Sequence, residues 1–167
     1  MQSVEKWSMT IHRLFSKDPN DEEENVTQNI YVFRFILFCI IVYSFEMLLN
    51  SVDIFIVDKT IFTRGYVTGC LFAAVYVLIL LHLGLEHPLT KYVSITAVSL
   101  IIMAASVSLT YHMIIIIMMP IIIAGMYTSK QLSIYTFVLT VLSIIISTYA
   151  GYYYGAVSYT HLTLPTN

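Results

Sequence analysis

Long apolar runs separated by short polar connections dominate the chain. Each run approaches the roughly 20 residues that a helix needs to cross a hydrocarbon layer of about 30 Å. The runs occupy residues 30–50, 66–85, 92–110, 113–127 and 132–154. Because short connections make successive helices antiparallel neighbours, the pattern predicts an all-α fold. We expect a polytopic transmembrane helix bundle of about five spans at residues 30–155.

The fourth run is the shortest and contains Pro120. Proline removes one helical hydrogen bond and can kink a helix, although neighbouring helices compensate for this in membranes. This run is therefore expected to be tilted, partly buried, or joined to the third run by a tight turn at Tyr111 and His112.

The first 29 residues have a different character. Residues 1–17 are predicted to form an amphipathic helix, because apolar residues recur at i, i+3 and i+4 spacing: Val4, Trp7, Ile11, Leu14 and Phe15. Such a helix either lies in the lipid headgroup region or packs against a soluble domain. The acidic segment that follows, residues 18–29, is predicted to be a solvated, flexible linker.

Composition supports membrane integration. The chain is 58% hydrophobic and 11% charged, whereas soluble domains average about 45–50% and 25%. The lipid bilayer is therefore the expected partner. A net charge of -2 without a basic stripe argues against nucleic acid. Cys39 and Cys70 lie inside apolar runs, which favours small buried side chains over a disulfide or a metal site.

The basic residues predict the orientation. With the N-terminus in the cytoplasm, most of them fall inside: Lys6, Arg13, Lys17, Arg34, Lys91 and Lys130. Only Lys59 and Arg64 then fall outside, so the positive-inside rule favours this arrangement in a plasma (inner) membrane. Gly65 and Gly69 have the spacing of a close-packing motif, and a homodimer remains open.

Glu46 is the main candidate for an intramembrane function. A carboxyl group inside a span is costly and therefore suggests a functional site. It would need a partner, such as His82, Tyr76 or Asn50, or a water-filled cavity. Alternatively, Glu46 lies near the outer interface, one turn from Asn50, and reaches water.

Two histidines complete the set of candidate sensing residues. His82 and Glu86 are spaced to share a helix face, but interfacial residues that cap the second span are a simpler interpretation than a metal site. His112 lies between the third and fourth runs, where it would sense pH, bind a small ligand or have no function. No catalytic motif, cofactor-binding motif or metal-ligand spacing is present in the sequence.

The last residues differ from the rest. Residues 157–166, VSYTHLTLPT, resemble the translation of a transposase mosaic-end sequencing adapter. On this interpretation residues 156–167 are excluded from the fold, and the chain is the first part of a longer protein. The alternative is a genuine polar tail.

Three sequence segments follow the amphipathic and acidic N-terminus: FEMLLNSVDIF, MMPIIIAGMY and TSKQLSIYTFVLTVLSIIISTYAGYYYG. In this order they resemble the N-terminal membrane sensor region of clostridial signalling proteins, over about residues 29–155. That resemblance implies a further span and a cytoplasmic output domain, often a diguanylate cyclase (GGDEF) domain or else a histidine kinase. No catalytic residue can be transferred to this chain.

Two other functions remain open. A transporter or permease fragment would show broken helices, midplane charges and inverted repeats; Glu46 and Pro120 fit this only in part. A complete small membrane protein, such as a scaffold subunit, requires the C-terminal tail to be genuine.

Overall fold

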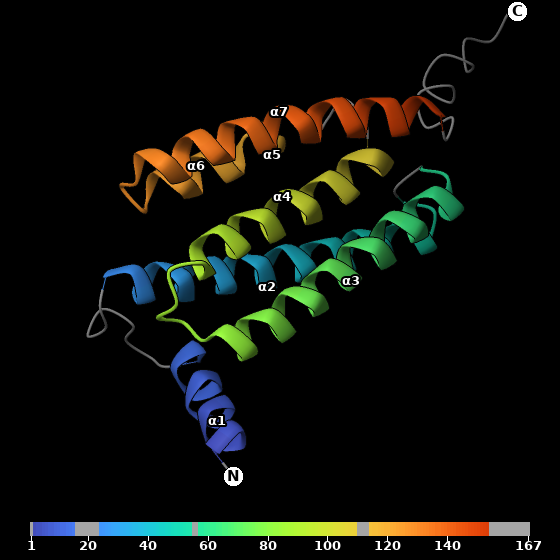
Figure 1. Ribbon diagram of the computed structural model, residues 1–167. Helices are drawn as coiled ribbons and strands as arrows, with labels where there is room; N and C mark the ends of the chain where they lie inside the picture. Colours follow the sequence, from blue (N-terminus) through green and yellow to red (C-terminus); the bar gives the residue numbers. More distant parts are fainter. Residues whose placement is uncertain (1, 16–23, 55–56, 110–113, 154–167) are drawn as a thin grey trace, which may run out of the picture.

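The computed structural model describes residues 2–15, 24–54, 57–109 and 114–153. Within these residues all regular structure is helical, which confirms the predicted all-α bundle. The helices are α1 (Gln2–Leu14), α2 (Glu24–Ser51), α3 (Lys59–Leu83), α4 (Thr90–Leu109), α5 (Ile114–Ile117), α6 (Met119–Gly125) and α7 (Lys130–Tyr153) (Figure 1). His112 and the tail at residues 156–167 lie outside the described residues.

Helix α4 is the centre of the bundle. Figure 1 shows it between α7 on one side and the pair α2 and α3 on the other. Of its apolar window 61% is buried, against 17–28% for the other long helices. Its buried face is rich in small residues, namely Ser94, Ala97, Ser99, Ala104, Ala105, Ser106 and Ser108. Small side chains let neighbouring backbones approach closely, which is how helices pack when lipid surrounds them.

Four candidate spans, and not about five, are found among the described residues. Helices α2, α3, α4 and α7 are long and apolar enough to cross a membrane, so the chain is a multi-pass helical membrane protein. The predicted fourth span is instead α5 and α6, which are only 4 and 7 residues long. Pro120 stands at the start of α6, where its missing N–H interrupts the helical hydrogen bonding.

The segment α5–α6 nevertheless carries the chain back along α4. It begins near the end of α4 and ends at Tyr127, whose hydroxyl reaches Asn29 near the start of α2. Helices α4 and α7 therefore run in the same direction (Figure 1). A helix break at this depth is tolerated because neighbouring helices cover it; Ile123 and Ala124 are buried.

Helix α2 starts earlier than predicted. Its first residues, 24–29, were expected to belong to the acidic linker, but they form the first turns of the helix. Val26 and Asn29 are almost completely buried, with 1% and 2% of their surface exposed. Packing against the end of the bundle therefore outweighs the local polarity of this segment.

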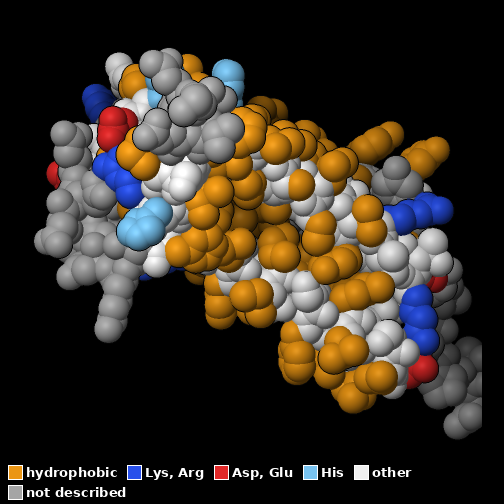
Figure 2. All heavy atoms as spheres, turned by 90° about the horizontal axis from the view of Figure 1, so that it is seen from below, with side chains coloured by type: hydrophobic (Ala, Val, Ile, Leu, Met, Phe, Trp, Pro, Cys, Tyr) orange, Lys and Arg blue, Asp and Glu red, His pale blue; other side chains and the backbone are white. Residues whose placement is uncertain are grey.

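Apolar side chains form a band on the outer faces of α2, α3 and α7. Figure 2 shows it between two ends where charged side chains gather. Exposed members of the band include Phe38, Phe45, Leu71, Leu78, Phe137 and Ile145. An apolar exterior of this extent is what a lipid-facing surface requires, and it would make a protein in water associate.

Helix α1 packs against the end of the bundle at which α2 begins. Leu14 is buried, whereas Trp7, Ile11 and Phe15 stay 46%, 47% and 66% exposed. Arg13 forms an ion pair of 2.8 Å with Glu86, beyond the end of α3. The predicted amphipathic face is thus only partly used in packing, and its exposed half is free for a headgroup layer.

Candidate functional site: an apolar groove and a polar latch

A groove lies between α2, α4 and the broken segment α5–α6. It has a cavity volume of about 200 Å³ and is open on one side. We call it the Glu46 groove. Its lining residues are Phe35, Phe38, Cys39, Val42, Tyr43 and Glu46 of α2, Ile101, Ile102 and Ala105 of α4, Ile116 of α5 and Met119 of α6. Glu46 is the only acidic or basic side chain in this set. A concave apolar site with a single polar group is typical of small-molecule sites.

Glu46 sits five residues before Ser51, the end of α2. That spacing corresponds to about 7.5 Å along a helix, so the carboxyl group lies within the span but near its end. The side chain is half-buried. Among the described residues it has no hydrogen-bond or ion-pair partner. The structure thus brings Glu46 into a groove and provides no protein group that compensates its charge.

None of the predicted partners of Glu46 pairs with it. Asn50 donates a hydrogen bond of 2.9 Å to the carbonyl oxygen of Val57, and the hydroxyl of Tyr76 lies 3.1 Å from that of Ser94. His82 is exposed near the opposite end, in the last turn of α3. None of the three candidate pairings forms among the described residues, because periodicity gives the face on which a residue lies but not the neighbour of that face.

The predicted sharing of one helix face by His82 and Glu86 was also wrong. Helix α3 ends at Leu83, and Gly84 then adopts a φ of 89°. This is a backbone conformation that residues with a Cβ rarely adopt. Glu86 therefore lies in the loop and pairs with Arg13. The described residues contain no group of three potential metal ligands. His112 lies outside the described residues.

Tyr43 anchors α2 to α3 and α4 beside the groove. Its hydroxyl lies 3.0 Å from the Ser108 hydroxyl, and its ring makes edge contacts with Phe62 and Tyr66 of α3. A Cβ at Gly65 would come within 2.6 Å of Ser108 Oγ and 2.7 Å of the Tyr43 hydroxyl. The predicted close-packing glycine thus serves contacts between helices of the same chain.

A second polar cluster ties the end of α6 to the start of α2. Tyr127 donates a hydrogen bond of 2.7 Å to Asn29 Oδ1, and Asn29 Nδ2 donates one of 2.8 Å to the Leu85 carbonyl. Gln28 Nε2 donates to the Met126 carbonyl at 2.6 Å. We call this cluster of Gln28, Asn29, Leu85, Met126 and Tyr127 the polar latch.

The side chains of the polar latch are largely excluded from solvent. Gln28, Asn29, Leu85 and Tyr127 are buried, and burial raises the pKa of the Tyr127 hydroxyl far above its ordinary value. The hydroxyl therefore remains a hydrogen-bond donor at physiological pH. Gln28 Oε1 is buried without a partner among the described residues. Because an unsatisfied buried acceptor is costly, the latch is held together by good bonds but carries one unfavourable group.

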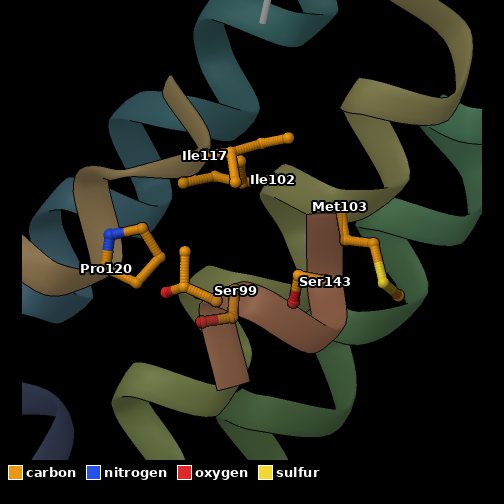
Figure 3. Close-up of a pocket in the computed structure, with 7 residues that line it drawn as sticks. Ser99, Ile102, Met103, Ile117, Pro120 and Ser143 are labelled. Atoms are coloured by element: carbon orange, nitrogen blue, oxygen red, sulfur yellow. The ribbon is translucent and has the colours of Figure 1, made fainter. Parts of the chain in front are cut away.

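The break between α5 and α6 faces a small polar spot. Figure 3 shows Pro120 and Ile117 opposite Ser99 and Ile102 of α4, with Ser143 of α7 close by. The hydroxyls of Ser99 and Thr140 are buried without partners among the described residues. Proline leaves the Ile116 carbonyl without its usual helical donor. The spot has essentially no room for a water molecule, so solvent does not satisfy these hydroxyls.

No known protein family, curated protein or solved structure matches the chain.

Sequence reasoning selected Glu46 but missed the latch. Asn29 was predicted to belong to the linker, and Tyr127 to end the fourth apolar run. One signal was available: Gln28 and Asn29 stand directly before an apolar run, and their uncharged amides can both donate and accept hydrogen bonds. The identity of their partners depends on the path of α5–α6.

Proposed function

We propose that this chain is the membrane sensor and anchoring module of a bacterial signal-transduction protein, with its N-terminus in the cytoplasm. One observation supports this most: the segment from α5 to Tyr127 contacts both candidate sites. Ile116 and Met119 line the Glu46 groove, and Met126 and Tyr127 form part of the polar latch. A ligand in the groove therefore touches the same short element that holds the start of α2.

The mechanism follows from this connection. A ligand that separates α2 from α5–α6 shifts the short helices, because their break at Pro120 gives them little hydrogen-bonded continuity with one another. That shift strains the bonds from Met126 and Tyr127 to Gln28 and Asn29. A signal then reaches the N-terminal end of α2 and the α1 helix docked beside it. Such switching requires a ligand with different affinities for two arrangements.

Charge distribution supports the cytoplasmic N-terminus. Arg13, Lys91 and Lys130 belong to the end of the bundle where α2 begins, whereas Lys59 and Arg64 belong to the opposite end. The larger basic group marks the cytoplasmic side. The exposed apolar residues of α1 then face the inner headgroup layer, as expected of an interfacial helix.

The output is proposed on the sequence resemblance alone. A diguanylate cyclase domain, or alternatively a histidine kinase, would receive the signal in the cytoplasm. Sequencing the locus on long, unfragmented DNA tests this part. A frame that runs beyond Gly155 into such a domain supports it, and a frame that runs into further apolar spans contradicts it.

Native cysteines allow a direct test of the coupling. Cys39 lines the groove and Cys70 does not. In a Cys70→Ala variant, alkylation of Cys39 with benzylmaleimide places a ring in the groove. Hydrogen exchange, read by mass spectrometry, should then become faster at residues 28–32 and 122–127. The matched control is alkylation of Cys70 in a Cys39→Ala variant, which should leave both segments unchanged.

Unchanged exchange after complete alkylation of Cys39 would contradict the coupling. Equal acceleration in the Cys70 control would also contradict it, because the effect would then be a general loosening of the bundle. The readout depends neither on the natural ligand nor on its charge.

A transporter is the second candidate. It is favoured by the broken segment α5–α6, which faces hydroxyls of Ser99 and Thr140 that have no partner among the described residues. Interrupted helices and intramembrane polar groups occur at transport sites. Purified protein in liposomes that contain a pH-sensitive dye tests this: proton flux above that of empty liposomes would support transport and replace the sensor proposal.

A further inference from the structure

We infer that the Glu46 groove binds a lipophilic cation, a small aromatic or aliphatic group that carries a positively charged amine. This inference rests on the proposed sensor function and names the ligand class of its site. Three features support this inference: the carboxyl group of Glu46, the apolar walls and the open side of the groove.

Charge complementarity selects a cation. Glu46 is the one acidic or basic side chain that lines the groove, and it is half-buried without a compensating partner among the described residues. A carboxylate in apolar surroundings is costly until a positive group approaches it. A ligand that brings an ammonium group supplies the missing partner, whereas an anionic ligand is repelled.

The volume limits the apolar part of the ligand. The cavity of about 200 Å³ is a little larger than the roughly 150 Å³ apolar cavity that accommodates benzene in an engineered protein. One aromatic ring with a short amine-bearing extension therefore fits, whereas a long lipid chain does not fit inside. Apolar side chains such as Val42, Ala105 and Met119 line the walls that would contact the ring.

The open side faces the bilayer. Phe38 at 62%, Val42 at 37% and Ile116 at 39% remain exposed on groove-lining positions, and they belong to the apolar exterior of the bundle. A lipophilic cation concentrates near the membrane surface with its ring among the acyl chains. Because Glu46 lies near the end of α2, such a molecule meets the carboxyl group without crossing the middle of the membrane.

Benzyltrimethylammonium is a suitable probe, because its charge is permanent. We would measure its binding to the full chain in uncharged detergent micelles by equilibrium dialysis, and compare it with neopentylbenzene, a neutral molecule of the same shape. The cation should bind more tightly. Glu46→Gln should weaken binding of the cation by more than about tenfold, because it removes one partner of a desolvated charge pair, and should leave binding of the neutral molecule nearly unchanged.

Two further variants make the outcome decisive. Asp53→Asn removes an exposed carboxylate at the same end of the bundle, one that pairs with Lys59 outside the groove, and it should leave binding unchanged. Ile116→Trp fills the groove mouth while Glu46 keeps its charge, and it should weaken binding of both probes. Circular dichroism verifies that each variant is folded.

Equal binding of the charged and neutral probes would overturn the inference, and so would equal losses in Glu46→Gln and Asp53→Asn. Neither result would decide whether the groove and the latch are coupled. That coupling is tested separately, because alkylation of Cys39 fills the groove without adding a charge.

Discussion

The hydroxyl of Tyr127 donates a hydrogen bond of 2.7 Å to the amide oxygen of Asn29, a residue 98 positions earlier in the chain. The same amide donates through its nitrogen to the carbonyl of Leu85. One buried side chain thus joins the start of α2, the α3–α4 loop and the end of α6. This relationship sets the return path of α5–α6, and it is the most direct target for mutation.

Tyr127→Phe removes the donor and leaves Asn29 Oδ1 buried without its partner. We expect the free energy of unfolding to fall by about 1–2 kcal/mol, measured by titration with a denaturing detergent in mixed micelles. Tyr149→Phe is the matched control, because Tyr149 is 72% exposed and should change stability by less than about 0.5 kcal/mol. Equal effects of the two substitutions would show that the latch bond contributes nothing.

Three glycines form a graded test of helix packing. Gly65→Ala places a Cβ 2.6 Å from Ser108 Oγ and 3.0 Å from the Ala104 carbonyl oxygen, so the Ser108 side chain must move and the α4 backbone must give way slightly. Such overpacking should cost about 1–3 kcal/mol. Gly69→Ala makes only an ordinary contact, 3.5 Å from the Tyr43 ring, and Gly125→Ala meets nothing within 4 Å.

The expected order of destabilisation is therefore Gly65, then Gly69, then Gly125, measured in the same unfolding assay. A Gly125→Ala variant as unstable as Gly65→Ala would contradict the packing arrangement. Ser108→Ala in the Gly65→Ala background should restore part of the loss, since it removes the nearest atom.

Docking of α1 should depend on burial more than on charge. Leu14 is 2% exposed, so Leu14→Ala should cost about 2–4 kcal/mol of docking free energy. Arg13 and Glu86 are 32% and 69% exposed in their side chains, so Arg13→Ala should cost below about 1 kcal/mol. Trp7 is the one tryptophan in the chain, and its fluorescence emission reports on α1 directly.

The expected result is a clear emission change in Leu14→Ala and little change in Arg13→Ala. In bilayers, lipids brominated near the headgroup should quench Trp7 more than lipids brominated deep in the acyl chain. Stronger quenching by the deep position, or none by either, would exclude a headgroup location for α1.

Pro120→Ala supplies the N–H that the helix lacks between α5 and α6. We expect a more continuous helix and slower hydrogen exchange at residues 116–122, because the Ile116 carbonyl gains a donor. Pro88→Ala, in the exposed α3–α4 loop, is the control and should leave this segment unchanged. Unaltered exchange in Pro120→Ala would mean that neighbouring helices, and not proline, impose the break.

The prediction of a membrane bundle succeeded where the signal is local. The length and hydropathy of the runs identified α2, α3, α4 and α7 and placed most of their ends to within a few residues. This succeeded because a span requires little beyond its own apolar composition. The starts of α2 and α3 were placed too late, since the residues before each run are helical and include buried side chains, Asn29 before the first run and Phe62 before the second. The fourth run was predicted to be a span because it is as apolar as one. Pro120, however, divides it into the short helices α5 and α6.

The same distinction between local and long-range signals applies to the candidate site. The sequence alone determined that Glu46 lies within an apolar span, that α1 is amphipathic and that basic residues favour one end, since these depend on spacing and composition. The folded structure was needed to show that Glu46 faces a groove bordered by α5–α6, that Gly65 accommodates Tyr43, and that Asn29 meets Tyr127. Contacts between residues far apart in the chain depend on how helices rotate and cross, and a repeating apolar surface fits many such arrangements almost equally well. The polar groups select one arrangement, because each must find a partner at hydrogen-bond distance once water is excluded.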